Sequence, residues 1–192
     1  MRKTKMAYIL IVIRRKGGAN MTVVTYRLLN SIEGYQCALA DLFQRCVKDG
    51  ASLGFLPHEP AEYFQHYWAG VAQDIQKEKT YLWATFLNEN LVGTVQLVRA
   101  TKANALHRAE IEKLMVHPKA RQQGIAFTLL ELVEQYAKQI GLSLLVLDTR
   151  TGDVSEQLYR KFGFEYAGLI PKFALSHTGS LEATTLFYKI LK

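Results

Sequence analysis

The chain has 192 residues, 49% of them hydrophobic, so it is long and apolar enough to bury the core of one ordinary domain. Its formal net charge of +7 would suit a nucleic-acid partner, but six of its 24 Lys and Arg residues lie within residues 1–20. The remainder carries 18 basic and 17 acidic residues and is nearly neutral. The composition therefore excludes a fibrous or disordered chain and argues against a nucleic-acid partner.

Residues 1–20 combine a basic start with an apolar run over residues 6–13. That run is too short to span a bilayer, and no small-residue cleavage pattern of a secretory signal follows it. We expect a leader of uncertain role over residues 1–20, one domain over residues 21–192, and no membrane partner. Cys37 and Cys46 lie nine positions apart, on opposite faces of one expected helix, and cannot form a disulfide. A reduced, cytoplasmic location fits these features.

The expected elements of the N-terminal half follow from hydrophobic periodicity. Residues 22–29 favour a strand, and apolar positions recur at helical spacing over residues 32–48 and 60–78. Residues 80–87 and 91–100 favour two strands joined by the hairpin-length turn "NEN". Two helices are thus expected to precede a hairpin.

The C-terminal half alternates strands and helices. A strand over residues 108–116, a helix over 124–140 and an almost wholly apolar strand over 142–149 form a β–α–β unit, which predicts two parallel neighbouring strands. The last elements are a helix over residues 153–163 and two strands, over residues 164–170 and 183–191. A loop over residues 171–182 joins the two strands. The expected fold is one α/β domain with a mixed central sheet of about seven strands and about four helices.

The junction "VHPKARQQGIA", residues 116–126, joins a strand to a helix and carries few reactive side chains. The first turn of a helix leaves backbone N–H groups unpaired and partly positive, so it binds phosphate when no bulk covers it. Gly124 and Ala126 leave that room, and Arg121 adds a forked cation. The motif alone also fits a tight structural turn. A nucleotide-hydrolysing loop is disfavoured because its lysine is absent, and the glycine spacing does not match a dinucleotide site.

The order "IEKLMVHP", "RQQGIA", "LLVLDT" and "LYRKFGF" resembles the GNAT N-acetyltransferases over roughly residues 21–192. More narrowly, "GASLGF", "NALHRAEIEKLMV" and "IPKFALSHTGSL" are similar to the branch that contains the tabtoxin-resistance acetyltransferase. The resemblance implies an α/β GNAT domain that uses acetyl-CoA as cosubstrate and needs no metal. It also allows a homodimer.

The resemblance implies a coenzyme site at the junction. Met115 and Val116 would pair with the pantetheine arm as if it were an added strand, in a gap where their strand splays from the strand that ends near Asp148. The Val116 N–H would polarise the thioester carbonyl. The pyrophosphate would be held by the backbone of Arg121, Gln122, Gln123, Gly124, Ile125 and Ala126.

Tyr159 matches the family tyrosine that donates a proton to the leaving thiolate and contacts the coenzyme. The alternative is a tyrosine that packs in the core. We expect Val154, Leu158 and Phe162 to form the apolar stripe of that helix, with Tyr159 beside it.

An attacking amine must lose its proton, and a carboxylate can accept it. Glu110 and Glu112 share one face of their strand by period two, with Lys113 on the other face, and Asp148 ends the adjacent strand. By resemblance we favour Glu110 and Asp148 as binders or activators of the amine, and Glu112 less so. The alternative is that one of them is a surface acid.

The resemblance implies an acceptor pocket between residues 50–57 and residues 171–180. Its candidate lining residues are Ser52, Phe55, His107, Phe173 and His177. The alternative for each of them is a loop-surface or packing role.

The favoured function is acetyl transfer to the primary amine of a small molecule, such as an amino acid, a polyamine or an antibiotic-like toxin, by direct attack in a ternary complex. Two alternatives stay open: a protein amine as acceptor, or a coenzyme A-binding sensor module without turnover. The sensor would dispense with the acids and the tyrosine, which this chain carries. A route through cysteine is disfavoured because both cysteines are remote from the junction.

Overall fold

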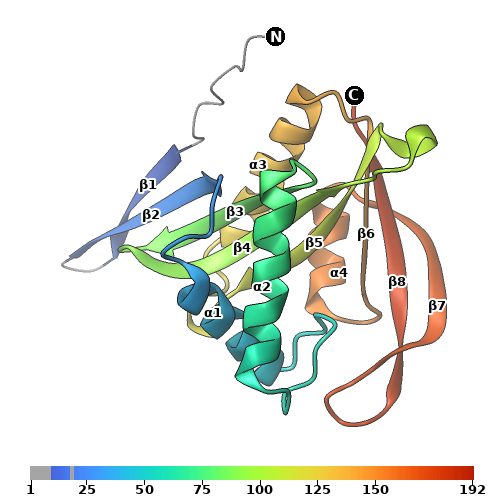
Figure 1. Cartoon of the computed structure of the whole chain (residues 1–192), viewed down its shortest axis with the longest axis horizontal. Coiled ribbons are helices and arrows are strands. Elements are labelled where there is room, and N and C mark those ends of the chain that lie inside the picture. The colour runs from blue at the N-terminus through green and yellow to red at the C-terminus, as the bar shows by residue number, and fades with distance from the viewer. Residues whose placement is uncertain (1–9, 18–19) are drawn as a thin grey trace.

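A computed structural model describes residues 10–17 and 20–192. Its centre is one eight-stranded sheet in the order β1-β2-β3-β4-β5-β6-β8-β7 (Figure 1). Neighbouring strands run antiparallel except for β5 and β6, which are parallel. The mixed sheet and the parallel pair confirm the α/β fold expected from the sequence.

The bounds of the elements are as follows. The strands are β1 (Leu10–Gly17), β2 (Asn20–Leu29), β3 (Thr80–Leu87), β4 (Asn90–Arg99), β5 (Arg108–Val116), β6 (Leu144–Arg150), β7 (Glu165–Leu175) and β8 (Leu181–Ile190). The helices are α1 (Gln36–Lys48), α2 (Ala61–Gln76), α3 (Ile125–Gln139) and α4 (Val154–Lys161), with short 3-10 turns η1 (Ala103–Ala105) and η2 (Pro118–Ala120).

Two differences from expectation concern the edges of the sheet. The eighth strand, β1, falls within the expected leader, residues 1–20, and pairs antiparallel with β2. At the other edge β7 runs to Leu175, through the start of the segment expected to be a loop, because its pairing with β8 resumes at Ala174 after a register shift. The expected start of the domain at residue 21 stays a prediction.

The four helices cover the two faces of the sheet, as Figure 1 shows: α1 and α2 lie on the near face, and α3 and α4 on the far face. Alternate residues of β3 serve the two sides, since Leu82 packs with the α1–α2 core and Trp83 packs with the α3–α4 core. The near-face core is aromatic, with the Phe43 ring 5.3 Å from that of Phe64 and 6.3 Å from that of Trp68. Each helix pair is therefore fixed by its own hydrophobic cluster.

The parallel pair is short, and its strands then separate. Only Arg108, Ala109 and Glu110 of β5 pair with β6. The last of these pairs joins Glu110 to Val146 of β6. β5 continues to Val116 along β4, and β6 continues along β8. The sheet therefore splays on the carboxyl side of Glu110, as the resemblance implied.

Two smaller expectations concern the cysteines and the membrane. Both cysteines are free, with Cys37 exposed and Cys46 buried, which confirms that they lie on opposite faces of α1. Across residues 10–17 and 20–192, no helix is both long and apolar enough to cross a membrane.

Truncation of Trp68 should destabilise the near-face core. Its side chain is 1% exposed, and Trp68→Ala would leave a cavity that costs about 3–5 kcal/mol of unfolding free energy in urea titration. Tyr63→Ala on the same helix is the matched control, because Tyr63 is 59% exposed and its removal should cost less than about 0.5 kcal/mol. Equal losses in both variants would contradict this packing.

Candidate functional site

The start of α3 carries little bulk. Gly124 precedes the helix with φ +76°, in the left-handed region that favours glycine. The Thr128 N–H donates to the Gly124 carbonyl at 3.0 Å, so N–H groups in the turn before Thr128 have no carbonyl inside the helix to bond. Gln122 also has a positive φ, +59°. This backbone can present several N–H groups to one anion.

A glycine in β4 brings the start of α3 close to the sheet. A Cβ at Gly93 would lie 3.1 Å from the Met115 carbonyl oxygen and 3.3 Å from the Cγ2 of Ile125. Ile125 and Met115 are themselves buried. The close approach therefore fixes the helix start against the end of β5, next to the splay. Sequence reasoning did not single out Gly93.

The Arg121 guanidinium, expected to add a cation at the junction, already has partners within the protein. Its Nη1 forms an ion pair with Asp49 at 2.6 Å, and its Nε donates to the Val116 carbonyl at 3.2 Å. The Sγ of buried Cys46 lies 3.6 Å from the same carbonyl. Arg121 thus joins the end of α1 to the end of β5, and its side chain holds the strand in place.

A β-bulge changes the expected faces of β5. The register against β4 shifts between the Gln96–Glu112 and Thr94–Met115 pairs, and Lys113 adopts φ +47°. The extra residue breaks the period of two. The Lys113 ammonium lies 3.6 Å from the Glu112 carboxylate and 5.4 Å from the centre of the Tyr67 ring of α2. The expectation that Lys113 faces away from Glu112 is therefore wrong.

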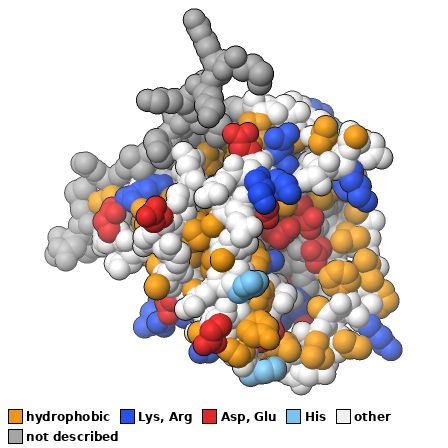
Figure 2. Space-filling model, in the orientation of Figure 1, with side chains coloured by type: hydrophobic (Ala, Val, Ile, Leu, Met, Phe, Trp, Pro, Cys, Tyr) orange, Lys and Arg blue, Asp and Glu red, His pale blue; other side chains and the backbone are white. Residues whose placement is uncertain are grey.

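The structure brings the predicted acids together beside the splay. Glu110 is itself an exposed residue, but partial desolvation of its carboxyl group raises its pKa, and the negative charges of Glu112 and Asp148 raise it further. Asp148 is exposed and accepts a hydrogen bond from the Thr184 hydroxyl at 2.7 Å. Figure 2 shows Asp and Glu side chains gathered on this face beside α2. Glu110 is thus a carboxylate that holds its proton more tightly than an ordinary glutamate.

Tyr159 of α4 packs in the hydrophobic core on the far face of the sheet, rather than beside the apolar stripe of its helix. It is 7% exposed, whereas Val154, expected in the stripe, is 77% exposed. Its ring centre lies 5.9 Å from that of Phe164 and 6.2 Å from that of Phe187. Burial raises its pKa first, and the charge of Asp148 second. The tyrosine therefore packs in the core, yet it is near enough to the acidic cluster for the charge of Asp148 to raise its pKa.

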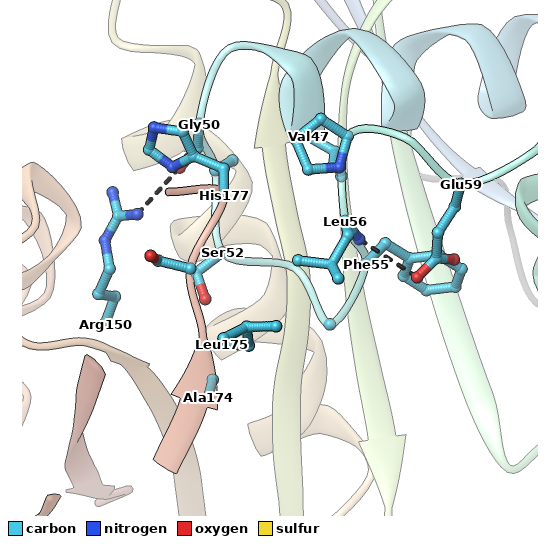
Figure 3. A pocket seen from close by; sticks show the side chains of 14 residues that line it. Val47, Gly50, Ser52, Phe55, Leu56, Glu59, Arg150, Ala174, Leu175 and His177 are labelled. Atoms are coloured by element: carbon cyan, nitrogen blue, oxygen red, sulfur yellow. Dashed lines mark hydrogen bonds between the residues drawn. The ribbon is translucent and has the colours of Figure 1, made fainter. Parts of the chain in front are cut away.

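A cavity of about 260 Å³ lies between the α1–α2 loop and the β7–β8 hairpin, the two segments expected to wall an acceptor pocket. Of the five candidate residues, Ser52, Phe55 and His177 line it (Figure 3). Phe173 is not part of the lining and is 53% exposed. His107 precedes β5, at the opposite end of that strand from the splay.

Arg150 also lines this cavity, and sequence reasoning missed it. It is the last residue of β6, two positions after Asp148. The only sequence signal was a basic residue at the end of an apolar strand. Within the described part of the chain, no group of three or more His, Cys, Asp and Glu side chains is placed to hold a metal ion.

Known proteins are similar to this chain in sequence and in fold. The Acetyltransferase (GNAT) family matches residues 38–164. An uncharacterized N-acetyltransferase from the hisH–hisA intergenic region of Azospirillum brasilense is 30% identical over 133 residues, which cover 68% of this chain and 77% of that protein. The streptothricin acetyltransferase of Escherichia coli is 30% identical over 100 residues, covering 52% of this chain and 55% of that protein.

The fold has a counterpart among solved structures. A putative acetyltransferase from Salmonella typhimurium, solved with its cofactor acetyl-CoA, has a TM-score of 0.73 and 15% sequence identity, with 88% of this chain and 94% of that chain covered. The narrower resemblance to the tabtoxin-resistance branch stays a prediction. Because the family match spans most of the domain, the chain belongs to the acetyltransferase (GNAT) family and is an N-acetyltransferase, as its sequence led us to expect.

Proposed function

We propose that the protein transfers the acetyl group of acetyl-CoA to a primary amine of a small, cationic molecule, by direct attack in a ternary complex. The observation that carries the proposal is the separation of β5 from β6 beyond Glu110. The start of α3, with Gly124 before it, lies near this separation, and so do the carboxylates of Glu110, Glu112 and Asp148. In the reaction the amine gives up a proton to a carboxylate, its nitrogen forms a bond to the acetyl carbon, and the carbon–sulfur bond breaks. The coenzyme leaves as a thiolate, which would take up a proton from Tyr159.

The coenzyme side uses the backbone. Within residues 121–126, backbone N–H groups at the start of α3 would bind the pyrophosphate, because the first turn of a helix has donors with no carbonyl partner inside the helix and carries a partial positive charge. The Arg121 N–H itself is bonded to the Pro118 carbonyl at 3.5 Å. Met115 and Val116 lie on the part of β5 that does not pair with β6, where the pantetheine arm would add as a strand. The Val116 N–H would then stabilise the negative charge that develops on the thioester oxygen.

The acceptor side uses the acids. A carboxylate whose pKa is raised is a stronger base, so Glu110 suits proton transfer from the amine better than an ordinary surface glutamate. Asp148, oriented by Thr184, adds negative charge that attracts a cationic acceptor. Glu112 is paired with Lys113, which favours a supporting electrostatic role for it.

A small acceptor is favoured over a protein. The α1–α2 loop and the β7–β8 hairpin form walls of the cavity, whose volume of about 260 Å³ suits part of a small molecule better than an extended peptide. One relative is named streptothricin acetyltransferase. The cytoplasmic location and the homodimer stay predictions.

A panel of amines tests the activity. Purified protein with acetyl-CoA should release free coenzyme A thiol with at least one of spermidine, L-lysine and streptothricin, and mass spectrometry should find that product one acetyl group heavier. Thiol release without an acetylated amine, or no release with any of the three, would count against the proposal.

Acid dependence tests the base. Only the deprotonated carboxylate accepts a proton, so kcat/KM should fall as pH drops through the raised pKa of Glu110. Glu112→Gln removes a charge that raises this pKa, so the acid side of the profile should move to lower pH. Glu131→Gln, at an exposed position of α3, should leave the profile unchanged. An unchanged pH profile in Glu112→Gln would show that Glu110 is not the base.

Gly93→Val tests the coenzyme side. The new side chain would push against the Met115 carbonyl and Ile125, displace the start of α3, and weaken coenzyme A binding at least about tenfold in calorimetry. Gly168→Ala in β7 is the control, since no atom lies within 4 Å of a Cβ there. Normal affinity in a folded Gly93→Val protein would argue that the helix start does not bind the coenzyme.

Tyr159→Phe tests proton donation. The ring keeps its core packing while the hydroxyl is lost, so turnover should drop by about tenfold or more with little change in coenzyme affinity. An unchanged kcat would leave Tyr159 with the packing role alone.

A further inference from the structure

One guanidinium joins three separate segments at the wall of the cavity. The Nη1 of Arg150 donates to the Gly50 carbonyl of the α1–α2 loop at 3.1 Å (Figure 3). Its Nη2 donates to Asp153, the N-cap residue of α4, at 2.8 Å, and its Nε lies 3.5 Å from the Glu182 carboxylate of β8. The side chain is 23% exposed, so water screens these contacts only partly.

The charge of Arg150 is already balanced. Asp153 and Glu182 place two carboxylates on one guanidinium, so Arg150 does not leave a net positive wall that would attract an anionic substrate. Its remaining contact is with a neutral backbone carbonyl, Gly50, in the segment that covers the cavity. This pattern suits a residue that holds a loop rather than one that binds a charged ligand.

The opposite wall meets the loop at the same point. A Cβ at Gly50 would lie 3.6 Å from Cε1 of His177, so the imidazole rests beside the glycine. The tip of the β7–β8 hairpin is itself fixed, because the Ser176 hydroxyl bonds those of Thr178 at 2.8 Å and Ser180 at 2.9 Å. The α1–α2 loop is thus held between a rigid hairpin and Arg150.

Arg150 lies on β6, the strand that also carries Asp148. Arg150 and Asp148 lie two residues apart on β6, so their backbones lie on the same side of the splay. A loop bonded to Arg150 is therefore kept in a fixed position relative to the carboxylates. The lining of the cavity includes none of these carboxylates, so an acceptor that uses both would extend from the cavity toward the splay.

We infer that Arg150 is a positioning residue, whose guanidinium clasps the loop of residues 50–57 over the cavity and so sets the affinity for the amine acceptor without affecting the coenzyme. The acceptor part of this inference rests on the proposed function, whereas the clasp itself does not.

Hydrogen exchange of the full-length protein tests the clasp. In Arg150→Met the amides of residues 50–56 should exchange about tenfold faster than in the wild type, because a charge-assisted bond to the loop is lost. Arg150→Lys should be intermediate, since an ammonium keeps the pairing with Asp153 but cannot span three partners. Lys161→Met, which removes an exposed charge from α4, should match the wild type.

Kinetics test the consequence, with the best acceptor among spermidine, L-lysine and streptothricin. The KM for that amine should rise about tenfold in Arg150→Met, while the KM for acetyl-CoA stays within about twofold. Unchanged exchange over residues 50–56 in the Met and Lys variants would overturn the clasp, and equal rises in both KM values would overturn the acceptor role. If the wild type acetylates none of the three amines, the proposed function fails, and the exchange comparison still decides on the clasp.

Discussion

The architecture depends on a parallel strand pair that is left incomplete. β5 and β6 share three paired residues and then separate, although each remains hydrogen-bonded to its other neighbour. Unpaired strand edges inside a sheet are costly unless another group satisfies them. The gap is therefore a place where an extended ligand can complete the sheet, and the surrounding features are arranged about it.

Two kinds of feature lie beside the gap: contacts that fix the backbone, and carboxylates that repel one another. Gly93 and Arg121 fix the start of α3 and the end of β5 from opposite sides, one by close packing and the other by an ion pair to Asp49. On the near face, partial desolvation and neighbouring negative charges raise the pKa of Glu110. A bulge with a positive φ at Lys113 turns a cation toward these acids and limits their repulsion. Functional sites commonly store such costs, which the two hydrophobic cores offset.

Much of the fold could be predicted from the sequence because its elements are strongly periodic. β3 and β5 have the predicted bounds, and the parallel pair follows from the strand–helix–strand order. The detailed register of strand pairing escaped prediction. A bulge depends on the register against β4, so period two placed Lys113 on the wrong face. The extension of β7 to Leu175 depends on pairing with β8, which no local pattern encodes.

The candidate site shows the same division. The backbone positions of the junction and the acids on β5 and β6 could be proposed from the sequence, because motif and strand position locate them. The surroundings of individual side chains could not: Tyr159 is a core residue, His107 lies at the far end of β5, and Arg121 is engaged by Asp49. Arg150 was missed because its partners, Gly50 and Glu182, are distant in sequence and meet only in the folded chain.

The central claim is that the edge of β5 beyond the splay, together with the start of α3, binds the coenzyme through backbone groups. Hydrogen exchange of the intact protein with and without saturating coenzyme A addresses it most directly, because it reports on individual amides. The account predicts slower exchange at residues 114–116 and 122–127, with residues 165–175 of β7 unchanged. Coenzyme A that binds without protecting either of the first two segments would contradict it.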